Sequence, residues 1–89
     1  MADQAWAHST WMANGGGLAH TPRPLLRGQG ENVAVRPACD VRDGTFVNAL
    51  FFASPAHREN MLRPDYRRFG AGFVTDANGA LWITERFGD

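Results

Sequence analysis

Residues 69–87 read FGAGFVTDANGALWITERF and carry the clearest structural signal in the chain. It holds two largely apolar segments, 69–75 and 80–87, on either side of Asn78-Gly79. An Asn-Gly pair between two such segments is the strongest short-range signal for a β-hairpin. The sequence therefore predicts an antiparallel hairpin here.

A two-residue turn at Asn78-Gly79 would place Val74 opposite Ile83 and Phe73 opposite Thr84. Both faces of the hairpin would then be apolar, one with Leu81, Ile83, Val74 and Phe87, the other with Phe69, Ala71, Phe73 and Trp82. A sheet that is apolar on both faces needs cover on both faces. We therefore expect an α/β fold, a three-layer α-β-α sandwich with a central antiparallel sheet.

Three further segments have helical signals. Residues 3–14 begin at a capping Asp3 and stop at three consecutive glycines, with Ala5, Ser9, Met12 and Ala13 on one face. Residues 41–53 follow a capping Asp40, and residues 54–62 follow the helix-starting pair Ser54-Pro55. Between the first and second helices, residues 15–40 read as a long ordered loop, with a short extended piece at 32–35.

Composition narrows the class of protein. The chain has 89 residues, enough for one domain, and its nine basic and nine acidic residues give a net charge of zero. A chain with no net charge has no overall positive potential that would attract nucleic acid. We interpret Arg63, Arg67 and Arg68 as a solvated cluster on the surface. The single cysteine, Cys39, excludes an internal disulfide. We expect neither a signal peptide nor a transmembrane segment within this chain.

Three side chains are candidates for chemistry, namely His20, Glu31 and His57. His57 lies in the first turn of the predicted 54–62 helix, where the helix dipole disfavours a charged imidazole. A neutral imidazole can bind a metal or accept a proton. Local sequence alone favours the simpler interpretation, in which each of these side chains is structural or solvated.

Four motifs in order change this weighing: GLAHTP at 17–22, GENVA at 30–34, SPAHRENMLRPDYRRFGAGF at 54–73 and LWITERFG at 81–88. Together they resemble the bacterial SCP-like branch of the CAP superfamily, which includes cysteine-rich secretory proteins and plant pathogenesis-related proteins. The resemblance covers nearly the whole chain. It implies the α-β-α fold named above and an extracellular or cell-envelope location.

The resemblance also implies a cleft in which His20, Glu31 and His57 converge, with Asn32 and Ser54 as structural support. Such a cleft could hold a divalent metal through His20, His57 and Glu31, and zinc is the most natural partner of imidazole ligands. His8 is expected on the helix surface, apart from this group.

The chain departs from the family pattern at its start, where the family's first helix is absent. Residues 1–89 are therefore expected to form a single, incomplete CAP domain. An apolar sheet face without its helix would favour self-association.

Three functions stay open. The first is a non-enzymatic binding or effector module for a metal, a small ligand or a protein. The second is a metal-assisted hydrolase of protease type, with Glu31 as ligand or general base. The third is lipid or sterol binding, to which nothing in the residues specifically points. No serine or cysteine nucleophile lies beside a base in the sequence, so a covalent mechanism has no support. The resemblance implies a family defined by its fold and cleft and not by one reaction, so we rank the binding module first and expect a protein that is not an enzyme.

Overall fold

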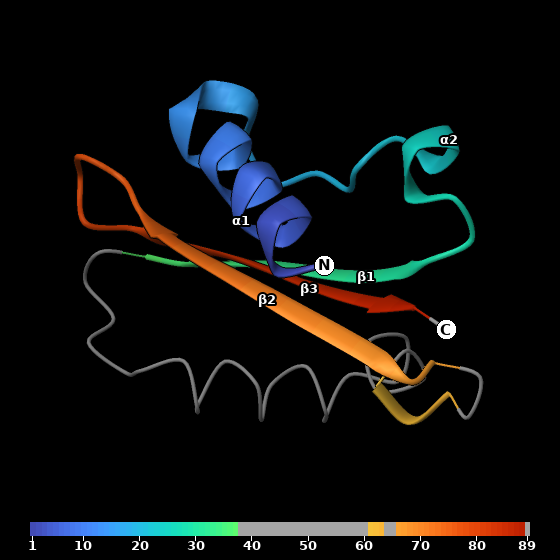
Figure 1. Ribbon diagram of the computed structural model, residues 1–89. Coiled ribbons are helices and arrows are strands. Elements are labelled where there is room, and N and C mark those ends of the chain that lie inside the picture. The colour runs from blue at the N-terminus through green and yellow to red at the C-terminus, as the bar shows by residue number, and fades with distance from the viewer. Residues whose placement is uncertain (38–60, 64–65, 89) are drawn as a thin grey trace.

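The computed structural model describes residues 1–37, 61–63 and 66–88. Its elements are helix α1 (Ala2–Trp11), the π-helical turn η1 (Met12–Gly16), the short helix α2 (Arg23–Leu26), and strands β1 (Gly30–Arg36), β2 (Arg68–Thr75) and β3 (Leu81–Gly88). The strands form one antiparallel sheet in the order β1-β3-β2 (Figure 1). No helix in this part of the chain is long and apolar enough to cross a membrane.

Helix α1 lies across one face of the sheet, close to β2 (Figure 1). A Cβ atom at Gly72 would collide with the backbone of Trp6, so the missing side chain of Gly72 is what allows this approach. The Ser9 hydroxyl donates to the Gly72 carbonyl at 2.8 Å and lies 2.8 Å from the Thr84 hydroxyl. The predicted inner face of the helix is confirmed for Ala5, Ser9 and Met12, which are all buried.

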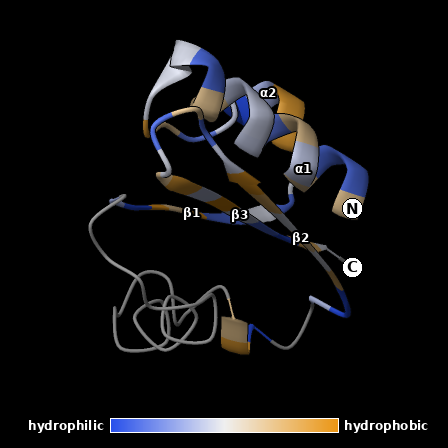
Figure 2. Cartoon of the chain, turned by 90° about the vertical axis from the view of Figure 1, so that its left-hand side faces the viewer, coloured by the Kyte–Doolittle hydropathy of each residue, from blue (hydrophilic) through white to orange (hydrophobic). Residues whose placement is uncertain are grey.

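The opposite face of the sheet carries a small apolar cluster. Ile83 is fully buried there and packs against Ala34, Leu81 and Met61. Figure 2 shows the sheet edge-on, with α1 and α2 together on its other side. The predicted α/β class with a central antiparallel sheet is thus confirmed. The predicted 41–53 helix and Cys39 lie outside the described residues, as does the 54–62 helix apart from Met61 and Leu62, which are helical.

The predicted hairpin is present, but its predicted register is wrong by one residue. Asp76 pairs with Ala80 around a three-residue loop, with Gly79 in the left-handed region at φ 86°. The Asp76 carboxylate accepts the backbone N–H groups of Asn78 and Ala80 at 2.9 and 3.0 Å, and the Trp82 indole N–H at 2.9 Å. An aspartate that accepts bonds from the following backbone in this way selects the longer loop.

This shift of register places the side chains of β2 on the opposite face of the sheet from the predicted one. Phe73 lies opposite Ile83, and Val74 lies opposite Trp82. Because directly paired residues share a face, Phe69, Ala71 and Phe73 lie on the Ile83 side, and Val74 lies with Trp82 on the α1 side.

The expectation of one long loop over residues 15–40 is also wrong. Helix α2 and strand β1 both lie within it, and β1 runs over Gly30–Arg36, longer than the expected 32–35. The extension comes from pairing with β3, which continues from Gly30–Phe87 to Arg36–Leu81. Glu31 therefore lies on strand β1. The predicted loop had placed it on an irregular segment.

Candidate functional site

A buried charge pair anchors the site. Glu31 on β1 is the direct cross-strand partner of Arg86 on β3, so the two side chains share a face of the sheet. It is the α1 face, because Arg86 lies two residues after Thr84, whose hydroxyl contacts Ser9 of α1. The Arg86 Nε donates to Glu31 Oε2 at 3.0 Å. The side chains are only 1% and 6% exposed, so this ion pair is shielded from water.

Thr21 completes the pair from the loop that follows α1. Its backbone N–H donates to Glu31 Oε1 at 2.8 Å, and its hydroxyl donates to Oε2 at 2.6 Å. The same hydroxyl accepts Arg86 Nη2 at 2.9 Å, and Gln29 Oε1 accepts Arg86 Nη1 at 3.2 Å. Every nitrogen of the guanidinium and both oxygens of the carboxylate therefore have partners, as buried charges require.

These bonds fix the ionisation of Glu31. Burial acts to raise the pKa of the carboxyl, but hydrogen bonds from Thr21, Arg86 and His20 together lower the pKa below its usual value of 4.5. Glu31 is therefore a carboxylate at neutral pH.

Glu31 in turn orients His20. His20 Nδ1 lies 3.0 Å from Glu31 Oε1. An ionised carboxylate can only accept, so the Nδ1 atom carries the proton in this bond. The neutral ring then has its lone pair on Nε2, and the side chain is 58% exposed. The network thus presents one accessible imidazole nitrogen in a fixed tautomer.

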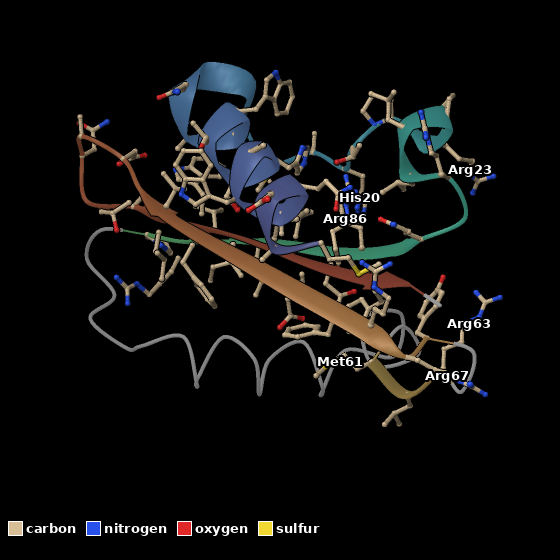
Figure 3. The ribbon with its side chains drawn as sticks, viewed as in Figure 1. His20, Arg23, Met61, Arg63, Arg67 and Arg86 are labelled. Carbon is tan, nitrogen blue, oxygen red and sulfur yellow. The ribbon has the colours of Figure 1, made fainter. Side chains whose placement is uncertain are left out.

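This nitrogen belongs to a side chain in the wall of a cavity. The cavity lies between α1 and α2 and has a volume of about 780 Å³. Figure 3 shows His20 and Arg86 between these two helices, above the sheet. The lining residues are Gln4, Ala7, His8, Trp11, His20, Thr21, Pro22, Leu25, Leu26, Arg27, Gln29 and Arg86.

The expectation that His8 lies apart from His20 is wrong, because both histidines line this cavity. His8 Nε2 donates to the Ala19 carbonyl at 2.6 Å, which ties α1 to the segment that carries His20. The His8 ring also stacks on Trp11, with centroids 5.5 Å apart. Although His8 and His20 are 12 positions apart in the sequence, the chain reverses direction after the glycines at 15–17, so both histidines reach the same cavity.

Asn32 lies on the other face of the sheet. It is fully buried, and its Nδ2 donates to Glu85 Oε1 at 3.2 Å. Burial raises the pKa of Glu85, an effect that the Asn32 bond partly offsets. Asn32 therefore supports the sheet from the face opposite to the one that carries Glu31.

Of the predicted cleft residues, the structure brings His20 and Glu31 together, and His57 and Ser54 lie outside the described residues. In the described ranges no group of three or more His, Cys, Asp or Glu side chains could hold a metal. Glu31 would have to give up donors to become a ligand, so the described atom that best fits a metal is His20 Nε2. A carboxylate behind a ligating imidazole is the usual second partner in such sites.

Sequence reasoning missed Arg86 and Thr21. Arg86 sits in an apolar strand pattern, and a cation flanked by buried strand residues is a signal that it has a partner. The identity of that partner depends on the β1–β3 register, which no local pattern gives.

Comparisons with known proteins bear on the fold and the family. The model of the family described as "CAP: Cysteine-rich secretory protein family" matches residues 1–86. Three chains among solved structures match. One is the structure of BmVAL-1, with a TM-score of 0.73 and 18% sequence identity over 96% of this chain and 55% of that one. The chain thus spans about half of that solved protein, and the likeness shows the fold. No curated protein matches.

Proposed function

Because this chain belongs to the cysteine-rich secretory protein (CAP) family, we propose that it is a non-enzymatic binding module, secreted or at the cell envelope. Its ligand site is the cavity between α1 and α2. One observation carries the proposal: His20 stands in the cavity wall, with its ring fixed from behind by the Glu31–Thr21–Arg86 network. Binding sites of this kind combine apolar walls with a few fixed polar groups.

The state of Glu31 supports binding over hydrolysis. A general base works best with a pKa near the working pH. The pKa of Glu31 is lowered, and each of its oxygens already accepts two donors. Glu31 is therefore suited to holding His20 in place and poorly suited to taking a proton from water.

The binding proposal is tested by screening a fragment library against ¹⁵N-labelled protein by NMR. We expect hits to shift the Trp11 indole and His20 ring signals together. Ala7→Phe, which fills the cavity from α1, should abolish these shifts, whereas Ala77→Phe in the hairpin loop should not. Hits that shift neither ring, or that survive Ala7→Phe, would overturn the proposal.

A divalent metal is the second candidate ligand, favoured by the His20–Glu31 pair. His20 Nε2 would hold the metal, zinc being the best match to imidazole, and Glu31 would orient the ring. A bound metal would supply a Lewis acid to the cavity.

Zinc titration by calorimetry at pH 7.5 and pH 5.5 tests the metal. Because protonation removes the imidazole as a ligand, affinity should fall at the lower pH and in His20→Ala. His8→Ala is the matched control, since His8 Nε2 is already bonded to Ala19. Equal affinity at both pH values would refute histidine ligation.

A further inference from the structure

We infer that the ligand of the α1–α2 cavity is an organic anion with an apolar body. This inference rests on the proposed function and adds the chemical class of the ligand. It starts from the charged side chains of the wall: among the residues that the structure describes, the lining contains Arg27 and Arg86 but no aspartate or glutamate. A cavity with this lining disfavours a cationic ligand and accepts an anionic one.

Arg27 is the cation available to such a ligand. The charge of Arg86 is already matched by Glu31 at 3.0 Å. Arg27 is exposed at the end of α2, where its backbone is left-handed at φ 52°, and among the described residues its side chain has no ion pair. An anion bound near Arg27 would therefore gain a charge-assisted hydrogen bond without breaking an existing one.

The cavity wall also carries apolar side chains, and Trp11 is the largest of them. The Trp11 ring stacks on His8, and a Cβ atom at Gly16 would lie 2.6 Å from the ring. These two close neighbours restrict the Trp11 side chain, so little side-chain freedom is lost when a ligand packs against it. Pro22, Leu25 and Leu26 add apolar surface, and Leu25 is 65% exposed.

The size of the cavity agrees with a small organic molecule. Its volume of about 780 Å³ falls within the roughly 300–1,000 Å³ of ligand pockets. The anionic group would lie at Arg27, and the apolar body along Trp11 and Leu25. Neither Arg27 nor the apolar side chains alone would select such a molecule.

Two fluorescent dyes separate these contributions. 8-Anilinonaphthalene-1-sulfonate carries a negative sulfonate, and N-phenyl-1-naphthylamine has the same ring system without it. We expect the sulfonate dye to bind the protein at one site, and more tightly than the neutral dye. Its affinity should fall with added salt, while that of the neutral dye should not.

Variants assign the effect to residues. Arg27→Gln should weaken the sulfonate dye roughly tenfold, as expected for one charged hydrogen bond, and leave the neutral dye unchanged. Leu25→Ser should weaken both dyes. Arg68→Gln, an exposed arginine on β2 that does not line the cavity, is the matched control. The thermal unfolding midpoint of each variant checks that dye binding reports the folded protein.

The outcomes distinguish the two proposals. If both dyes bind equally and Arg27→Gln changes neither, the ligand class is wrong and the binding cavity stands. If Ala7→Phe leaves the binding of both dyes unchanged, the dyes bind elsewhere and the proposed function loses its site as well.

Discussion

Glu31 and Arg86 form a buried pair whose members depend on each other. Arg86→Met should destabilise the protein by about 3–5 kcal/mol, because it leaves the Glu31 charge buried without its partner. Glu31→Gln combined with Arg86→Met should recover much of this loss, since no unpaired charge remains. Urea unfolding of the single and double variants gives the free energies. Additive losses in the double variant would show that the pair is not coupled.

At the level of single residues, the sequence predicted part of the site. The motif match placed His20 and Glu31 in one cleft, and the structure brings them within 3.0 Å of each other. The charged partner of Glu31 is Arg86, 55 positions further along the chain. Such a contact depends on strand pairing across the whole chain, and no short pattern contains it.

At the level of elements, the close approach of α1 and β2 gives the next prediction. Gly72→Ala should destabilise the protein by about 3 kcal/mol, at the upper end of overpacking costs, because the new Cβ meets helix backbone that cannot rotate away. Gly28→Ala is the control: its φ is 80° but nothing lies within 4 Å, so only the backbone cost of about 1–2 kcal/mol applies. Thermal unfolding compares the two variants, and equal losses would contradict the packing argument.

The elements themselves were predictable where local signals agreed. The first helical segment ends among the glycines at 15–17, after the π-helical turn η1 that follows α1, and Asn78-Gly79 marks the hairpin. The register was not predicted, because Asp76 accepts bonds from the turn and lengthens the loop by one residue. The hydrogen bonds of the Asp76 side chain thus determine the face of the sheet on which Phe73 lies.

For the whole molecule, two buried carboxyls predict how stability depends on pH. The pKa of Glu85 is raised in the folded protein. The free energy of unfolding therefore increases as the pH falls from neutral and decreases as the pH rises through that pKa. The pKa of Glu31 is lowered, so its contribution is complete above the unfolded value of 4.5 and is lost as pH falls through the folded pKa. Their combined contribution is therefore largest in mildly acidic solution.

Urea unfolding at a series of pH values tests this profile against two variants. Glu85→Gln should remove the gain in stability between neutral pH and the region of 4.5. Glu31→Gln should remove the loss below that region. If the Glu85→Gln profile runs parallel to that of the original chain over the whole range, Glu85 does not titrate as its burial implies.

The central position of β3 has a consequence for synthesis on the ribosome. β3 lies between β1 and β2, and it is the last of the three strands to be translated. Roughly 45 residues separate the end of β1 from the start of β3, which at 5–20 residues per second corresponds to about 2–9 s. During that interval the nascent chain displays β1 without the neighbour it has in the finished sheet. Chaperone capture during translation should therefore peak before Leu81 leaves the exit tunnel.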